Sequence, residues 1–134
     1  MAKSATPADL QIKPRDLHID REAPTPRWWL NGDPVATAFY NALSVTFPKG
    51  EGFFVDSGRR FREGTPPRLE REINAFIKQE VLHTREHLAF NRHVADQGYD
   101  VTLLDRDVDA ALALTKGRPP IGALAATTAL EHFT

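Results

Sequence analysis

The amino-acid sequence predicts an all-α protein, and two observations support this fold class. After the proline pair at positions 66–67, no glycine or proline occurs until Gly98, and apolar residues recur at helical spacing through this stretch. Alternation of apolar and polar residues, which is typical of half-buried β-strands, is nearly absent, and its best candidate is the short segment 101–104. We therefore expect a bundle of helices.

Length and composition are those of one globular domain. The chain has 134 residues, of which 41% are hydrophobic and 26% charged. A net charge of -1 gives no electrostatic reason to expect nucleic acid or an anionic membrane as a partner. No apolar run approaches the roughly 20 residues needed to cross a bilayer, and the N-terminus lacks the apolar core of a secretion signal. A cytoplasmic location is therefore expected.

Residues 1–33 are predicted to form an irregular N-terminal arm, because four prolines interrupt any helix there. The segment 27–30 contains two tryptophans and is expected to anchor this arm on the bundle. The first helix is expected to begin at Pro34 with Asp33 as its N-cap. It should kink or break at Pro48, since proline lacks the amide hydrogen that a helix requires.

A second helical stretch is predicted over about residues 49–62. The long helix follows, from about 66 to 97, with Thr65 as a possible cap and Gly98 just past its end. A shorter helix is expected over 106–116, capped by Asp105. The last helix should begin at the proline pair 119–120.

No stop signal occurs before Thr134, so the chain is expected to end inside this last helix. We therefore expect the bundle domain, residues 34–134, to be incomplete and to correspond to the N-terminal half of a longer type of protein.

One face of the long helix has a polar centre between apolar ends. Positions spaced alternately by four and three residues share this face, and its middle carries Glu80, His83 and His87. Burying unpaired carboxylates and imidazolium groups costs several kcal/mol, and a metal cation would supply the compensating charge. Because the chain has no cysteine, the ligands must be nitrogen and oxygen atoms, which suit iron, manganese or zinc. His87 is expected either to bind the metal or to orient a ligand.

Two further glutamates fall on faces that should point inward. Glu51 shares helical spacing with aromatic residues if the helix keeps its phase past Pro48, and Glu131 aligns with Leu124 in the last helix. Together with Glu80 and His83, they give Glu, Glu-x-x-His and Glu on successive helices. This is three-quarters of the ligand pattern of a ferritin-like di-metal bundle. The favoured fold is therefore a ferritin-like bundle, with iron or manganese as the preferred metal.

Several short motifs also resemble a bacterial family described as predicted metal-dependent hydrolases. The resemblance extends from about Lys13 onward and rests on the segments 41–44, 47–48, 50–51, 53–54, 79–80, 83, 85–87, 90–91, 97–100 and 129–134. It implies a metal-dependent hydrolase in which Glu51, Glu80, His83 and Glu131 occupy matching positions. It also implies further C-terminal helices with a second set of glutamate and histidine ligands.

Three alternatives remain open. The ligand set also looks like a carboxylate-bridged di-iron centre, which usually activates dioxygen, so the chain could be an oxidase or oxygenase and not a hydrolase. Residues 83–87 also read as H-x-x-E-H, a motif in which two histidines bind one zinc ion and the glutamate, here Glu86, acts as general base on water. The chain could instead be a non-catalytic helical interaction fragment. A homodimer could complete the bundle and its ligand set, and the substrate, a small molecule, is not identified by these residues.

Overall fold

The computed structural model describes residues 9, 11–19 and 25–133, and these contain four helices. The helices are α1 (Pro34–Arg60), α2 (Pro67–Asp96), α3 (Thr102–Ala113) and α4 (Pro120–Phe133). The predicted all-α class is confirmed. The remaining positions of the predicted arm, and Thr134 at the end of the predicted bundle domain, lie outside the described residues.

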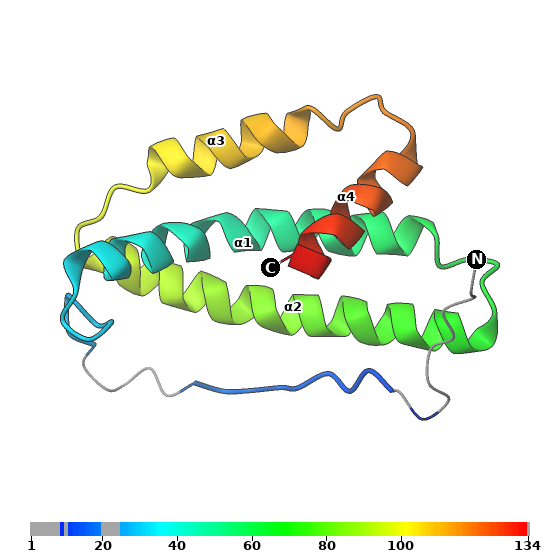
Figure 1. Ribbon diagram of the computed structural model, residues 1–134, viewed down its shortest axis with the longest axis horizontal. Helices are drawn as coiled ribbons and strands as arrows, with labels where there is room; N and C mark the ends of the chain where they lie inside the picture. Colours follow the sequence, from blue (N-terminus) through cyan, green and yellow to red (C-terminus); the bar gives the residue numbers. More distant parts are fainter. Residues whose placement is uncertain (1–8, 10, 20–24, 134) are drawn as a thin grey trace.

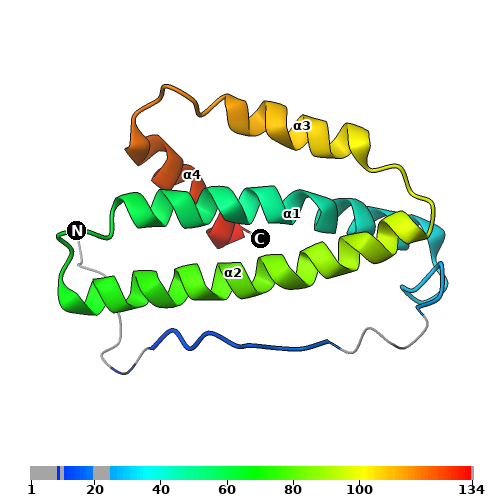
Figure 2. The same cartoon turned by 180° about the vertical axis from the view of Figure 1, so that it is seen from behind.

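Helix α1 is the centre of the molecule. The long helices α1 and α2 lie side by side and antiparallel, while α3 lies on the other side of α1 and α4 crosses in front of α1 (Figure 1). The view from behind shows the same arrangement (Figure 2). Among the described residues, α1 packs against each of the other three helices, and those three do not pack on one another. The core is correspondingly small, and its most buried apolar residue is Val94.

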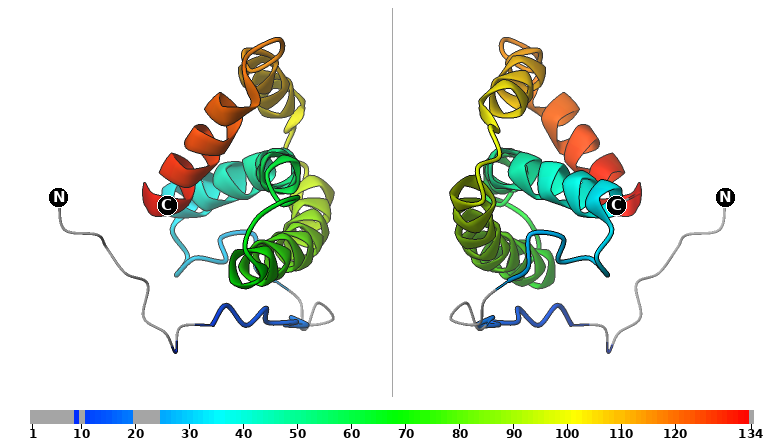
Figure 3. Two further views of the ribbon diagram at one scale, coloured as in Figure 1. Left: turned by 90° about the vertical axis from the view of Figure 1, so that its right-hand side faces the viewer. Right: turned by 90° about the vertical axis from the view of Figure 1, so that its left-hand side faces the viewer.

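Residues 11–19 of the N-terminal arm run along α2 in an extended conformation on the side away from α3 (Figure 3). The backbone amide of Arg15 donates a hydrogen bond to Gln79 Oε1 at 2.9 Å, and Arg85 forms an ion pair with Asp16 at 2.7 Å. Trp29 anchors the end of the arm, because its indole nitrogen donates to Asn41 Oδ1 at 2.9 Å. No helix of the described chain is long and apolar enough to span a bilayer.

Helix α1 begins as predicted, but it is one helix and not two stretches separated at Pro48. Asp33 Oδ1 accepts hydrogen bonds from the amides of Val35 and Ala36, as an N-cap does. The missing amide of Pro48 leaves the carbonyl of Ser44 without its helical donor. The side chain of Asn91 in α2 supplies a replacement, since its Nδ2 donates to that carbonyl at 3.2 Å. The helix therefore continues in phase to Arg60.

Three local predictions are wrong. Thr65 does not cap α2, because its hydroxyl donates to the Arg62 carbonyl and the N-cap position is Pro66. Helix α3 starts at Thr102, earlier than predicted, so the segment 101–104 is not a strand. Asp105 lies within α3 and does not cap it. Its carboxylate binds Lys49 of α1 at 2.7 Å and so holds α3 against α1.

Candidate metal centre

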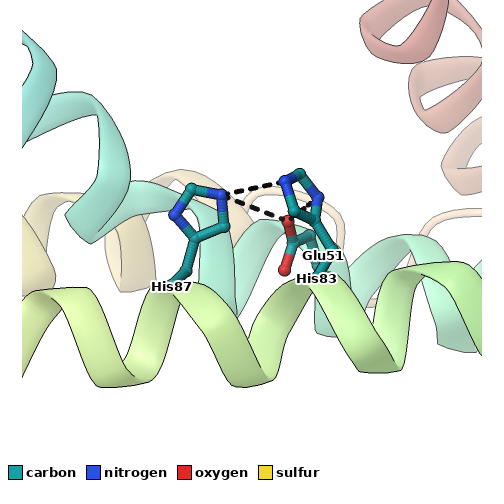
Figure 4. Close-up of side chains that lie close together, drawn as sticks. All are labelled: Glu51, His83 and His87. Atoms are coloured by element: carbon teal, nitrogen blue, oxygen red, sulfur yellow. Dashed lines mark hydrogen bonds and ion pairs between the residues drawn. The ribbon is translucent and has the colours of Figure 1, made fainter. Parts of the chain in front are cut away.

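The site lies between α1 and α2, where one buried carboxylate faces two imidazole rings. Glu51 is in the middle of α1 and is only 1% exposed. His83 and His87, one turn apart on α2, point toward it (Figure 4). Among the described residues, these three form the one group of acidic and histidine side chains whose ligand atoms all lie within 4.8 Å of one another.

The distances within this group are short. His83 Nδ1 lies 2.7 Å from Glu51 Oε1, and His87 Nε2 lies 3.8 Å from the same oxygen. The two Nε2 atoms are 3.2 Å apart. Although Oε1 is within ion-pair distance of His83, no donor reaches it in suitable geometry, and it is a buried oxygen without a hydrogen bond. A buried oxygen of this kind is costly, and a cation would satisfy it.

The other Glu51 oxygen is held by a residue that the helical spacing did not identify. Thr84 Oγ1 donates to Glu51 Oε2 at 2.6 Å, which orients the carboxylate so that Oε1 faces the histidines. The pKa of Glu51 is raised, because burial and the charge of Glu131 raise it more than the Thr84 hydrogen bond lowers it. Thr84 lies next to His83 in sequence, off the predicted polar stripe, so no spacing rule pointed to it.

His87 is held as a neutral imidazole. Its ring stacks on Phe47 of α1, with centroids 4.5 Å apart and planes 12° from parallel. Burial lowers the pKa of His87 to about 4, and the neighbouring His83 acts in the same direction. A neutral imidazole has one nitrogen lone pair available, which is the form that binds metal ions.

Glu80 and Glu131 line the same region but lie outside the compact group. Both line a cleft of about 830 Å³ that also contains Glu51 and His83. Glu80 is buried. Burial, followed by the charges of Glu131 and Glu51, raises the pKa of Glu80 to about 7. Glu131 is exposed, but partial burial of its carboxyl group raises its pKa.

The position of Glu131 depends on a polar contact made one turn earlier in α4. Thr127 is buried, and its hydroxyl lies 2.8 Å from the hydroxyl of Ser57 in α1. This contact fixes the rotation of α4 and directs Glu131 to the cleft. Leu124 and Glu131 shared the predicted inward face of this helix, whereas the serine on α1 was not predicted.

Glu86, the general base of the H-x-x-E-H interpretation, points elsewhere. Its Oε1 lies 2.8 Å from Arg85 Nε, and Glu86 is not among the residues that line the cleft. Arg85 also binds Asp16 of the N-terminal arm. The histidine pair of that motif is therefore present at the site, while its glutamate takes part in attaching the arm.

The donor set fits a divalent cation. Two imidazole nitrogens and one carboxylate oxygen bind zinc in several hydrolases and iron(II) in non-haem enzymes. The half-exposed ring of His83 leaves the group open to the cleft. Fold and site together define an all-α protein with a carboxylate–histidine group that could bind a metal.

The family comparison agrees with this description. The profile of a family described as "Predicted metal-dependent hydrolase" matches residues 13–134. The chain belongs to this family. No curated protein and no solved structure matches it.

Proposed function

We propose that this chain binds a divalent metal ion through Glu51, His83 and His87 and uses it in a hydrolytic reaction. The observation that carries the proposal is the buried Glu51 Oε1, which makes no hydrogen bond of suitable geometry and faces two imidazole rings. Without a cation, this arrangement confines a carboxylate in a poorly solvated place. A bound ion would act as a Lewis acid and lower the pKa of water.

The cleft supports a second, weaker ion site next to the first. Glu80 and Glu131 line the same cleft, and burial of Glu80, followed by the charges of Glu131 and Glu51, raises the pKa of Glu80 to about 7. Mutual repulsion among three carboxylates is relieved when they share cations. We propose a di-metal centre, as in ferritin-like bundles, with iron or manganese as the preferred metal. Zinc belongs to the mononuclear alternative.

The residues then have distinct roles. Glu51, fixed by Thr84, and the two histidines bind the first ion. Glu80 exchanges a proton near neutral pH when it is not bound to metal, and with Glu131 it provides the ligands of the second ion. Apolar side chains of the cleft, among them Leu43 and Phe54, limit the access of water and favour a substrate with an apolar part.

Metal content measured by elemental analysis tests the proposal. The protein should be reconstituted with manganese, iron(II) or zinc, passed through a desalting column and compared with variants. The wild type should hold two ions per chain, Glu80→Gln one, and Glu51→Gln fewer than one. Glu70→Gln changes an exposed glutamate of α2 and should match the wild type.

Glu86→Gln separates the alternatives. In our proposal it retains metal and hydrolytic activity, because its carboxylate is paired with Arg85. In the zinc-peptidase interpretation it retains one zinc ion and loses activity. Equal, negligible metal in the wild type and Glu51→Gln would refute the metal site altogether.

A further inference from the structure

A proline in the middle of α1 is connected to the metal-binding face of His87 by an unbroken chain of hydrogen bonds. Pro48 cannot donate to the carbonyl of Ser44, four residues earlier. That carbonyl accepts a hydrogen bond from Asn91 Nδ2 of α2 at 3.2 Å. Since a carbonyl oxygen can only accept, this contact fixes which end of the Asn91 amide is nitrogen.

The orientation of Asn91 determines the direction of the next hydrogen bond. With Nδ2 at the carbonyl, Oδ1 faces the Ser44 hydroxyl at 2.8 Å. An amide oxygen is an acceptor, so the serine must donate its single hydrogen to it. The opposite arrangement would place two oxygen lone pairs against each other at this short distance.

The serine hydroxyl then has only acceptor capacity left for His87. Ser44 Oγ lies 2.7 Å from His87 Nδ1. Because the hydroxyl hydrogen is already used, the hydrogen of this contact must come from the imidazole. His87 therefore carries its hydrogen on Nδ1, and the lone pair is on Nε2, the atom that faces Glu51 and His83.

We infer that Ser44 and Asn91 are positioning residues that hold His87 in the Nδ1–H tautomer and present Nε2 as a metal ligand. This inference rests on the proposed metal site and adds the residues that prepare it. Metal-binding histidines in general have their second nitrogen fixed in this way, and loss of the partner weakens metal binding by about 10–100-fold. Here the partner is a buried hydroxyl, 5% exposed at Ser44, and Pro48 frees the carbonyl that orients the whole chain.

Nuclear magnetic resonance of the metal-free protein tests the tautomer directly. The ¹⁵N chemical shifts of His87 distinguish a protonated Nδ1 from a protonated Nε2 in a neutral ring. The wild type should show Nδ1–H. Ser44→Ala removes the acceptor, and Asn91→Ala lets the serine donate to Nδ1 instead, so both variants should move the hydrogen to Nε2.

Metal affinity of the same variants tests the consequence. Manganese or zinc titration should show about 10-fold or more weaker binding by Ser44→Ala, and Ser44→Thr, which keeps the hydroxyl, should restore most of the affinity. Thr37→Val is the matched control. This threonine of α1 is also buried, and its hydroxyl accepts a hydrogen bond from the backbone amide of Leu30, so its loss should lower stability without changing the tautomer or the affinity.

The two hypotheses fail in different ways. An Nε2–H signal for His87 in the wild type, or equal metal affinity of Ser44→Ala and Thr37→Val, overturns the positioning role even if the protein binds metal. A wild type that shows the Nδ1–H signal but binds no metal supports the hydrogen-bond chain and refutes the proposed function. If Ser44→Ala does not fold, Asn91→Ala carries the same test.

Discussion

At the level of single residues, the three carboxylates of the cleft differ in how the protein surrounds them. Glu51 is fully enclosed and has a hydrogen-bond donor in Thr84. Glu80 is also buried, and the charges of Glu131 and Glu51 add to the effect of burial in raising its pKa. Glu131 is exposed. The charge on Glu80 is therefore the one that the metal-free protein accommodates least well.

The pH dependence of stability should reveal this charge. The pKa of Glu80 is raised from 4.5 to about 7 in the folded chain. Its contribution to stability is therefore present below pH 4.5 and is lost as the pH rises through about 7. Glu80→Gln removes the titration, so in the presence of chelator the variant should gain on the order of 2 kcal/mol over the wild type at pH 8 compared with pH 5.

Urea denaturation at both pH values measures this difference. Glu70→Gln, at an exposed position of α2, should change stability equally little at pH 5 and pH 8. His87 has the opposite sign, because its pKa is lowered from 6.5 to about 4 and its contribution is lost as the pH falls through that range. A pH-independent effect of Glu80→Gln would show that this carboxylate is well solvated.

At the level of the helices, the hydrogen bonds at the helix termini explain which predicted caps were correct and which were wrong. Asp33 precedes a proline and was recognised as a cap, because both residues have a local preference for the start of a helix. Thr65 has the same local preference, but its hydroxyl donates a hydrogen bond to the Arg62 carbonyl and does not cap α2. Asp105 was assigned to a cap and binds Lys49 across an interface instead. The helix propensity of single residues cannot predict such contacts between helices.

Substitution of the capping residue Asp33 should destabilise the protein more than substitution of Thr65, which does not cap a helix. Asp33→Ala removes the acceptor of two amide hydrogens and should cost about 1 kcal/mol in the free energy of unfolding. Thr65→Ala breaks one exposed hydrogen bond within a turn and should cost clearly less. Thermal or chemical denaturation of the two variants provides the comparison, and equal losses would contradict the observed difference in capping.

The candidate site also divides into features that follow from local sequence and features that depend on contacts between helices. Helical periodicity placed Glu80, His83 and His87 on one face, and it placed Glu51 correctly because the phase of α1 survives Pro48. It could not show that Glu51, and not Glu80, is the carboxylate closest to both histidines. That depends on the register between α1 and α2, which Thr84 and Asn91 help to set through contacts with α1. No spacing within one helix encodes this register.

At the level of the whole molecule, α2 is attached to the other helices through its interface with α1. Helices α3 and α4 pack on the opposite side of α1, and within the described residues they do not pack on α2. The interface between α1 and α2 contains buried polar side chains, Glu51 and Glu80 among them, in positions where apolar side chains would form a larger core. The predicted ferritin-like arrangement and the homodimer both stay predictions.

A metal ion at Glu51, His83 and His87 would join α1 to α2 at the middle of this interface, so binding should stabilise the whole fold. An ion that binds only the folded state at 100 times its dissociation constant adds about 2.7 kcal/mol, which corresponds to roughly 10 °C in the melting temperature for a domain of this size. Calorimetry with manganese or zinc should show this increase in the wild type.

Magnesium, which prefers oxygen ligands and keeps its water, should have little effect on the imidazole-containing site. Glu51→Gln should lose the response to the transition metal, because one of the two joined helices then has no charged ligand. An equal shift with magnesium, or an undiminished shift in Glu51→Gln, would mean that the ion binds elsewhere and does not join the two long helices.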